Sequence, residues 1–357
     1  MLPFVLILIG CYLAALVCEK KYNDKALASF RWVIHVNGIR GKTSVCRLID
    51  ARLRGAGLRV FTKTTGTDAV CIDTSGTERP IRRLGGANIL EQLAVIRRAY
   101  REGAEVLILE CMAVQPELQA AAQQQIVKAK VGVITNVRYD HIFEMGESLD
   151  EIAGSLSATI PDHGTLFTAD EAYFPFFQEK CRQKGTTAVL CRPQEGMDEN
   201  EAVAEAVARS LGVEGAAGPL CRDFGARHLY RAEKCPLLNL FSANDPQSSL
   251  ALLRQYGGDG GDVTLLYNNR ADRPDRLVLF IRHFFPVVRY RKIVVMGENR
   301  ALAVRLLRRA CCGPVEQAAD WRAALRSAEG EMVVGLGNIK GQAYELLRYL
   351  EGEDVNE

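Results

Sequence analysis

Hydrophobic residues are most concentrated at the beginning of the chain. Leu2–Cys18 is an uncharged, almost wholly apolar run of 17 residues. As a helix it is about 25 Å long at ~1.5 Å per residue, near the lower limit for crossing a hydrocarbon core of roughly 30 Å. No Lys or Arg precedes it, whereas Lys20 and Lys21 follow it closely. The sequence therefore predicts a single-pass membrane anchor at residues 1–18 with the catalytic domains in the cytoplasm. A cleaved signal peptide and a buried core helix are the alternatives.

Beyond this run, short apolar segments alternate with stretches of helical periodicity. The predicted strands are Arg31–Val36, Val106–Leu109, Val131–Thr135, Val263–Tyr267, Lys292–Met296 and Met332–Val334. The predicted helices include Thr43–Leu53, Glu91–Arg101, Pro116–Lys130 and Ala301–Ala310. Short apolar strands separated by helices are typical of a mainly parallel sheet covered on both faces. The sequence therefore predicts an α/β fold.

The length of the chain indicates more than one domain. At roughly 150 residues per domain, 357 residues suggest two domains and an appendage. The glycine-rich stretch Gly257–Gly261 is the best linker, because four glycines around one Asp cannot form a stable helix or strand. We therefore expect a central domain at residues 19–258 and a smaller C-terminal α/β domain at residues 259–357.

Composition and charge narrow the class of protein. The 45 Lys and Arg residues nearly balance the 43 Asp and Glu residues, which argues against a protein that coats nucleic acid. With 48% hydrophobic and 25% charged residues, the chain has the composition of an ordinary globular protein. The 11 cysteines include no CxxC pair, so neither a zinc site nor a disulfide framework is expected. We expect mostly free thiols in a reducing compartment.

A candidate phosphate-binding loop lies between the first predicted strand and helix. The segment reads HVNGIRGKTS over residues 35–44, and backbone N–H groups in such a turn and at the helix start point toward an anion. Lys42 supplies a charge for the outer phosphates, and Thr43 or Ser44 offers a hydroxyl to Mg²⁺. Val36 occupies the position of the first glycine in GxxxxGK[ST], so an ordinary strand–helix turn is the alternative. The candidate nucleotide-binding residues are Asn37, Gly38, Arg40, Gly41, Lys42, Thr43 and Ser44.

Polar side chains follow two further strands. Glu110 ends the run VLILE, where an isolated carboxylate is costly to bury without a cation. Asn136, Asp140 and His141 follow the strand VGVIT. Since ligands of open α/β sheets bind beyond the carboxyl ends of the strands, these residues suit a divalent ion beside the phosphate loop. Alternatively, Glu110 forms a salt bridge and His141 is a surface residue that caps a helix.

These segments carry a family resemblance. HVNGIRGKTS, LECMAVQPE and ITNVRYDH resemble the Mur ligase superfamily, which includes folylpolyglutamate synthetases. Further motifs make the chain similar to the catalytic subunit of poly-γ-glutamate synthases of the PgsB/CapB type. These motifs are TTGT (Thr64–Thr67), ANILEQ (Ala87–Gln92), ECMAVQPELQ (Glu110–Gln119) and FSANDP (Phe241–Pro246). The resemblance extends from the apolar run to Gly335–Gly341 and covers nearly the whole chain.

The resemblance implies a fold and an activity. The fold is a P-loop-containing, Mur-ligase-like central domain with a smaller Rossmann-like C-terminal domain. The activity is an ATP-dependent amide ligase that converts a γ-carboxylate to an acyl phosphate and joins it to the amine of glutamate, extending poly-γ-glutamate.

The resemblance also assigns roles to residues. It places Lys42 at the β- and γ-phosphates, Thr43 and Glu110 at a first Mg²⁺, and His141 at a second Mg²⁺ that orients the acceptor carboxylate. Asn244 matches a family asparagine near adenine, and a simple Asn-Asp-Pro turn is the alternative.

The C-terminal domain offers a further candidate contact with the nucleotide. The polar run Asn268–Arg273 follows a predicted strand and suits a phosphate or ribose contact, with Arg270 or Arg273 as the phosphate ligand. A solvated charged loop is the alternative.

Three departures from the family limit this transfer. The carbamylated lysine of many Mur ligases has no counterpart, because no lysine lies between Lys130 and Lys180. Asn269 stands where an aspartate is expected after the first strand of the C-terminal domain, and Asp272 is the nearest carboxylate. An apolar segment replaces the N-terminal domain that recognises a UDP-sugar, which argues against a peptidoglycan precursor as substrate.

The implied partners are glutamate, the growing polyglutamate chain and integral-membrane subunits that synthesise and export the polymer; nucleic acid is not among them. A homo-oligomer is left open. The other functions considered are a related ligase for another amino acid, a P-loop kinase acting on hydroxyls, and a non-catalytic nucleotide-binding scaffold of a membrane complex.

Overall fold

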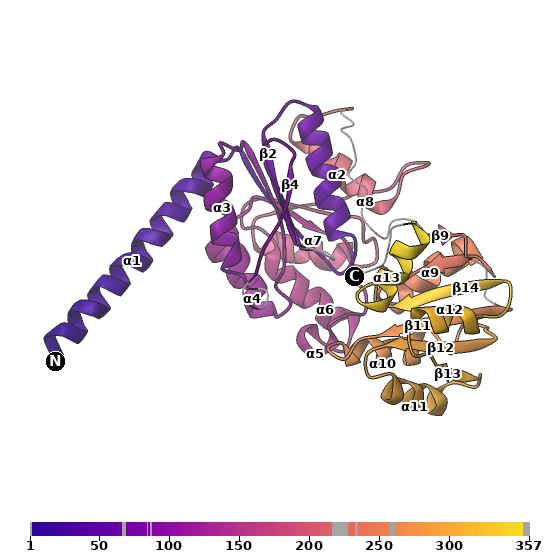
Figure 1. Cartoon of the computed structure of the whole chain (residues 1–357). Coiled ribbons are helices and arrows are strands. Elements are labelled where there is room, and N and C mark those ends of the chain that lie inside the picture. The colour runs from indigo at the N-terminus through magenta and orange to yellow at the C-terminus, as the bar shows by residue number, and fades with distance from the viewer. Residues whose placement is uncertain are drawn as a thin grey trace. The chain divides into compact units, whose positions relative to one another are not determined.

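The computed structural model describes residues 2–65, 69–83, 85, 88–215, 228–232, 235–257 and 261–352. The chain divides into two compact units (Figure 1). Unit 1 contains Met1–Val137 and Glu144–Cys221, and unit 2 contains Arg138–Phe143 and Arg222–Glu357.

Unit 1 is built on an eight-stranded sheet with the strand order β4-β3-β2-β5-β1-β6-β7-β8. The strands are β1 (Trp32–Asn37), β2 (Val60–Thr64), β3 (Val70–Ile72), β4 (Glu78–Pro80), β5 (Val106–Glu110), β6 (Val131–Ile134), β7 (Thr165–Thr168) and β8 (Thr187–Leu190). From β2 to β8 the pairing is parallel, and β3 and β4 add an antiparallel edge. The predicted, mainly parallel α/β fold is therefore confirmed.

Helices cover both faces of this sheet. On one face, α2 (Lys42–Gly55) and α8 (Glu199–Ser210) pack with alternate side chains of the central strands into one hydrophobic core. On the other face, α3 (Glu91–Arg101), the π-helix η1 (Ala122–Val127) and the end of α1 (Leu2–Ser29) enclose a second core. The remaining helices of unit 1 are α4 (Pro116–Ala121), α6 (Leu149–Leu156), η2 (Ser157–Thr159) and α7 (Phe174–Gln183). The short α5 (Ile142–Met145) spans the point at which the chain passes from unit 2 back to unit 1.

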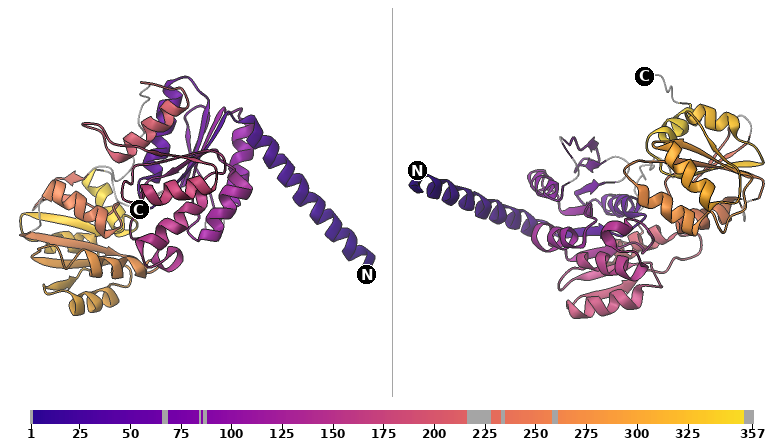
Figure 2. Two further views of the ribbon diagram at one scale, coloured as in Figure 1. Left: turned by 180° about the vertical axis from the view of Figure 1, so that it is seen from behind. Right: turned by 90° about the horizontal axis from the view of Figure 1, so that it is seen from below.

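Helix α1 extends well beyond the apolar run. It is one uninterrupted helix of 28 residues that runs out from unit 1, as the views of Figure 2 also show. Its large apolar side chains from Phe4 to Val17 are 42–65% exposed. Among the described residues, it is the one helix long and apolar enough to cross a membrane. This finding is consistent with the predicted single-pass anchor.

Unit 2 is a second parallel α/β sheet, with the strand order β13-β12-β11-β14-β10-β9. The strands are β9 (Leu229–Tyr230), β10 (Leu237–Asn239), β11 (Val263–Asn269), β12 (Lys292–Gly297), β13 (Val315–Gln317) and β14 (Met332–Gly337). The helices are α9 (Pro246–Gly257), α10 (Pro274–His283), α11 (Arg300–Ala310), α12 (Trp321–Ser327) and α13 (Gln342–Leu350). Two separate apolar cores involve opposite faces of the strands, as expected for a Rossmann-like domain. Among the described strands of this sheet, β9 alone pairs in the antiparallel sense.

The division between the units differs from the predicted domain boundary. The predicted boundary at 258–259 lies outside the described residues, whereas the compact units divide between Cys221 and Arg222. β10 pairs with β14, so the segment before residue 258 already belongs to the second sheet. The glycine-rich stretch separates α9, which ends at Gly257, from β11, which begins at Val263. It therefore connects two elements of one unit, and glycine is also a favoured residue in such connections.

Strand register brings the candidate site residues of unit 1 to one edge of the sheet. Val36 pairs with Glu110 on one side of β1, and Asn37 pairs with Ile134 on the other. The segments that follow β1, β5 and β6 therefore leave the sheet side by side.

Candidate active site

The loop between β1 and α2 depends on two glycines. Gly38 and Gly41 adopt φ angles of 124° and 77°, which other residues rarely adopt. A Cβ on Gly38 would lie 2.0 Å from the Thr135 hydroxyl oxygen, and one on Gly41 would lie 2.3 Å from Oδ1 of Asn200. The backbone of the loop can therefore pass this close to its neighbours only with glycine at both positions.

The end of β6 fixes the middle of this loop. The backbone N–H of Arg40 donates to Oδ1 of Asn136 at 3.0 Å. The carbonyl of Arg40 accepts from the Thr135 hydroxyl at 2.5 Å and from Nδ2 of Asn136 at 3.2 Å. Asn136 thus contacts the phosphate loop directly, and the structure assigns it a positioning role that the sequence did not specify.

The N-terminus of α2 has the features of an anion site. Its N-cap residue, Gly41, provides no side-chain hydrogen bond, and the first turn carries no acidic residue. Lys42 folds over the loop, and its ammonium donates to the carbonyls of Gly38 at 2.7 Å and Ile39 at 3.3 Å. The positive end of the helix dipole and the Lys42 charge therefore lie together at the loop. Ser44, in the same first turn, is half-buried.

Glu110 is buried beside this helix terminus with neutral donors only. Its side chain is 2% exposed, and Oε2 accepts from the Thr43 hydroxyl at 3.0 Å and from the Thr65 N–H at 2.6 Å. Within the described ranges, no Lys, Arg or His pairs with it. The hydroxyl of Thr64 is also buried and has no partner among the residues described. The predicted alternative of a salt-bridged Glu110 therefore does not fit this environment.

This donor set suits Mg²⁺ held jointly with a nucleotide. Thr43 and Glu110 supply oxygen ligands, which Mg²⁺ prefers. The described ranges contain no group of three His, Cys, Asp or Glu residues that could hold a metal alone. Mg²⁺ commonly takes one or two protein oxygens and completes its octahedron with phosphate and water, so a site this sparse fits the ion.

Asn37 is oriented differently from the sequence-based prediction. Its side chain is buried, and Nδ2 donates to Oε1 of Gln119 at 2.7 Å and to the Thr159 hydroxyl at 3.1 Å. These bonds tie the end of β1 to α4 and η2. The side chain of Asn37 therefore supports the loop from within the unit.

Two ionisable residues, His35 and Lys63, lie on the face of the sheet that α3 and η1 cover, opposite to α2. Burial lowers the pKa of His35 to about 4, only partly opposed by its 2.9 Å hydrogen bond with Gln123 of η1. Lys63 is fully buried at the end of β2, where burial lowers its pKa, and its ammonium lies 2.9 Å from Glu91. Sequence reasoning named neither residue as a site: His35 begins the HVNGIRGKTS segment but was given no role, and Lys63 stands in a strand outside the motifs.

In unit 2, the segment Arg138–Phe143 carries the predicted Asp140 and His141. Asp140 is 2% exposed and forms ion pairs with Arg273 and, at 3.4 Å, with Arg276. His141 has a φ of 52°, and its Nε2 lies 3.4 Å from Nη1 of Arg273. The same Nε2 lies 4.0 Å from Oδ2 of Asp140, so the imidazole stands between a guanidinium and a carboxylate.

The same segment is tied to unit 2 by two further contacts. The Tyr139 N–H donates to Oε1 of Gln247 at 3.2 Å, and the Tyr139 ring stacks on His283 with centroids 4.9 Å apart. Unit 2 therefore provides contacts for three successive residues, Tyr139, Asp140 and His141.

Asn244 and Arg270 also lie in unit 2, but in different environments. Asn244 has a left-handed backbone with φ 60°, and its Oδ1 accepts from Nη1 of Arg276 at 3.1 Å. Arg276 also contacts Asn338, and it is 4% exposed. Arg270 lies on the loop after β11 and donates to Oδ1 of Asp272 at 2.9 Å. Arg276 therefore contacts both Asn244 and Asp140. Arg270 instead pairs with Asp272.

Arg276 and Asn338 were not predicted as site residues. Arg276 precedes Leu279 and Phe280 of α10 at spacings of three and four, so it occupies a position of the apolar face. An arginine at such a position is the one signal in the sequence that could have revealed it.

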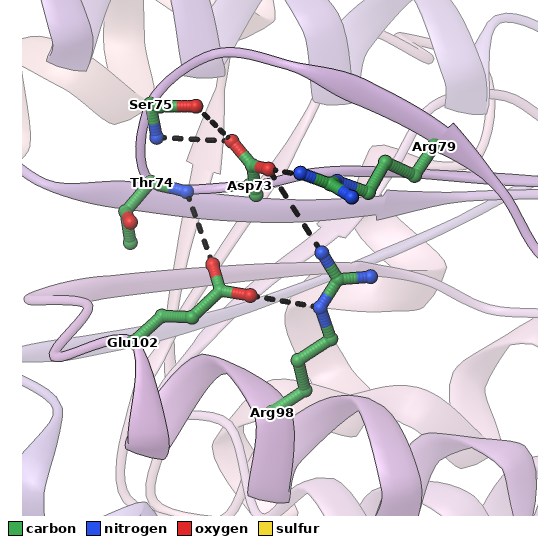
Figure 3. A pocket seen from close by; sticks show the side chains of 6 residues that line it. All are labelled: Asp73, Thr74, Ser75, Arg79, Arg98 and Glu102. Carbon is green, nitrogen blue, oxygen red and sulfur yellow. Dashed lines mark hydrogen bonds and ion pairs between the residues drawn. The ribbon is translucent and has the colours of Figure 1, made fainter.

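A polar pocket of about 690 Å³ lies elsewhere in unit 1 (Figure 3). It is lined by Asp73, Thr74, Ser75, Arg79, Arg98 and Glu102. Asp73 accepts from Ser75 and pairs with Arg79, while Glu102 pairs with Arg98 at 2.8 Å. These charged groups pair with one another, so we interpret them as stabilising the turn between β3 and β4.

Comparison with known proteins agrees with this architecture. Residues 36–212 match the family model "Mur ligase middle domain", and residues 227–353 match "Poly-gamma-glutamate synthase CapB C-terminal domain". The fold is similar to that of Escherichia coli FolC in complex with ADP, with a TM-score of 0.70, 16% identity and coverage of 93% of this chain and 92% of that one. It is also similar to Mycobacterium tuberculosis folylpolyglutamate synthase complexed with ADP, with a TM-score of 0.66, 16% identity and coverage of 96% and 95%.

The fold and the phosphate loop define a Mur-type ligase. The chain is 31% identical to PGA synthase CapB of Bacillus subtilis (strain 168), over 99% of both chains. It is 32% identical to capsule biosynthesis protein CapB of Bacillus anthracis, over 95% of this chain and 80% of that protein. The chain therefore belongs to the CapB family of poly-γ-glutamate synthases within the Mur ligase superfamily. The predicted activity class, an ATP-dependent acid–amino-acid ligase that makes polyglutamate chains, is confirmed.

Proposed function

We propose that this chain extends poly-γ-glutamate one residue at a time at the cytoplasmic surface of the membrane. The terminal phosphate of ATP is transferred to the γ-carboxylate at the end of the polymer, and ADP leaves. The amine of the incoming glutamate attacks the resulting acyl phosphate, and phosphate leaves as the amide forms.

The observation that carries this proposal is the convergence of Lys42, Thr43 and Glu110 at the N-terminus of α2. Lys42 is poised for the β- and γ-phosphates, because its ammonium already lies over the loop between Gly38 and Ile39. The first-turn N–H groups, including that of Ser44, cradle the same phosphates. Arg40 takes part through its backbone, which Asn136 and Thr135 hold in place.

Thr43 and Glu110 are the proposed ligands of the first Mg²⁺. Mg²⁺ bound there would neutralise charge on the phosphates during transfer. Glu110 is directed at this position by two neutral donors, Thr43 and Thr65, and its burial favours binding of a cation.

His141 is the proposed ligand of the second Mg²⁺. A neutral imidazole binds a metal through the lone pair of a ring nitrogen, and Nε2 of His141 lies 3.4 Å from Nη1 of Arg273. Binding of a metal therefore requires Arg273 to turn away, and its contacts with Asp140 and Asp275 provide alternative positions. In the same unit, we assign Asn244 to the adenine and Arg270 to a phosphate or the ribose.

The membrane assignment rests on α1. We propose that residues 1–18 anchor the chain and that integral-membrane subunits take up the polymer as it grows. The oligomeric state is left open by this proposal.

The proposed function is tested by ADP release from membranes that contain the chain and its partner subunits, with MgATP and each amino acid in turn. Glutamate-dependent ADP release, with products that differ by the mass of one glutamyl unit, is the expected result. ADP release that is indifferent to every amine would instead indicate a kinase. Nucleotide binding without turnover would indicate a scaffold.

Two variants test the assignment of the residues. Lys42→Ala should abolish ATP turnover, whereas His141→Ala should leave nucleotide binding largely intact and remove ligation. Equilibrium binding of a fluorescent ATP analogue, compared with product formation, separates the two effects. An equal loss of nucleotide affinity in both variants would contradict the metal role of His141.

A further inference from the structure

Helix α1 changes character at Glu19 without a break. From Phe4 to Val17 its large side chains are exposed and apolar, whereas beyond Glu19 it packs against the body of unit 1. This part, from Phe4 to Val17, is about 21 Å long at ~1.5 Å per residue, which is shorter than the roughly 30 Å core of a bilayer. A span this short draws the residues that follow it toward the membrane surface.

The base of α1 is attached to α3 and η1 by specific contacts. Glu19 pairs with Arg97, whose guanidinium also lies 5.8 Å from the centroid of the Tyr22 ring. Tyr22 packs edge to face on Tyr100 at 6.0 Å. The buried Nδ2 of Asn23 donates to the carbonyl of Ile126 at 2.9 Å. These contacts involve successive turns, so the base of α1 cannot swivel on unit 1 while they hold.

Two further features stiffen the junction. Asp24 pairs with Lys128 at 2.5 Å, and Ala26 is fully buried in the core shared with α3. Helix α1 ends at Ser29 and β1 begins at Trp32, so no linker separates the helix from a central strand. The orientation of α1 in a membrane therefore sets the orientation of the whole sheet.

Basic side chains lie around this junction. Lys20, Lys21 and Lys25 are exposed and form no ion pair within the described part of the chain. Arg101, in the last turn of α3, is also exposed. Each Lys or Arg near an acidic membrane surface contributes about 1 kcal/mol of attraction, which corresponds to about a fivefold effect.

We propose that the base of α1 and the last turns of α3 form one membrane-contact surface, which binds acidic lipid headgroups and seats unit 1 directly on the bilayer. This inference rests on the proposed anchor. It adds that the ATP-binding unit is held rigidly at the surface, with Lys20, Lys21 and Arg101 among the headgroups.

The experiment is hydrogen–deuterium exchange on the full chain in nanodiscs of phosphatidylcholine, alone or mixed with phosphatidylglycerol. With the acidic lipid, exchange should slow by at least about fivefold in peptides that cover Glu19–Ser29 and Glu91–Arg101, and high salt should remove the effect. The variant Lys20→Gln/Lys21→Gln/Arg101→Gln should lose this protection. The matched variant Lys180→Gln/Arg182→Gln/Lys184→Gln, which removes three basic residues in and just after α7, should keep it.

Equal protection in neutral and acidic nanodiscs would overturn the headgroup contact. Fast exchange in Pro3–Cys18 in both lipids would show instead that α1 is not in the bilayer, and the anchor itself would then fail. ADP release with glutamate, measured on the same samples, reports separately on the ligase function.

A charge exchange tests the rigid attachment. Glu19→Arg should speed exchange in Glu19–Ser29, because it places two cations together, and Glu19→Arg/Arg97→Glu should restore the slow exchange. If the single variant leaves exchange unchanged, or the exchanged pair fails to restore it, the Glu19–Arg97 contact does not hold α1 against unit 1.

Discussion

Glu110 and Asp140 are equally buried carboxylates with opposite surroundings. Each is 2% exposed; Glu110 is the last residue of β5 and Asp140 lies in the segment after β6, the two strands that flank β1. Asp140 is neutralised by the guanidinium groups of Arg273 and Arg276. Among the residues that the structure describes, the Glu110 carboxylate receives a hydroxyl and a backbone N–H but no cation. A buried charge requires compensation. Asp140 has it within unit 2, and the lack of a protein cation at Glu110 among the described residues supports our proposal that Glu110 binds a metal ion.

The largest effect is expected from Glu110→Gln. The amide keeps the size and an acceptor oxygen but loses the charge, so ligation should fall by more than the roughly 10- to 100-fold typical of losing a partner outside the metal's own ligands. Stability should be unchanged or slightly higher. ADP release as a function of Mg²⁺ concentration, together with thermal unfolding, measures both effects. Glu117→Gln, on the exposed side of α4, is the control. Full activity of Glu110→Gln would remove the distinction between the two carboxylates.

The corresponding change in unit 2 is Arg276→Met. It leaves Asp140 with one fewer cation in a buried site, and removing one partner of a buried pair typically costs about 3–5 kcal/mol. The free energy of unfolding of unit 2, measured by denaturant titration, should fall by an amount of this order. Arg282→Met, at an exposed position of the same helix, should change it by less than about 1 kcal/mol. A loss below about 1 kcal/mol for Arg276→Met would show that Arg273 alone neutralises Asp140.

His35 extends the comparison to a buried group that stays neutral. Its pKa is lowered to about 4 by burial, so the unfolded chain binds a proton that the folded chain does not between pH 6.5 and about 4. Stability contributed by neutral His35 is complete above pH 6.5 and falls by about 3 kcal/mol as the pH drops to about 4. Denaturant titrations at several pH values give the free energy of unfolding at each pH. Between pH 6.5 and about 4, this free energy should change less with pH for His35→Gln than for the parent chain. His163→Gln, at an exposed position, should keep the slope of the parent chain.

The smallest effect is expected from Arg270→Gln. Arg270 pairs with Asp272, whose side chain is 60% exposed, so its loss should change the free energy of unfolding by less than about 1 kcal/mol. If Arg270 binds a phosphate or the ribose as proposed, the KM for ATP should rise about tenfold through the lost charged hydrogen bond. Steady-state kinetics with varied ATP measures this. An unchanged KM would leave Arg270 as a solvated surface residue.

Sequence patterns correctly predicted several of the apolar strands and long amphipathic helices. The segment from β1 to α2 and helix α3 appear where periodicity placed them. The antiparallel strands β3 and β4 have three residues each, too few to show an alternation of polar and apolar side chains, and β4 reads Glu-Arg-Pro, which resembles a loop. Their pairing depends on neighbouring strands rather than on local propensity.

The candidate site was predictable where it is local in sequence. Lys42 and Thr43 lie within one motif. Glu110 ends an apolar strand, and a carboxylate in such a place suggests a cation as its partner. The ion pair between Asp140 and Arg276 joins residues 136 positions apart, so it depends on the tertiary fold. The orientation of Asn37 was likewise not predictable, because its partners, Gln119 and Thr159, come from two other elements.

The position of β1 has a consequence for the synthesis of the chain. This strand follows α1 directly, yet in the sheet it lies between β5 and β6. It can pair on both sides only after Val131–Ile134 has left the ribosome, about 5–20 s after β1 itself at ~5–20 residues per second. During that interval the unpaired strand is tethered to a helix that is apolar enough to have entered the bilayer. If α1 inserts during synthesis, unit 1 completes its sheet beside the membrane, because β1 pairs with β6 only after that strand has emerged.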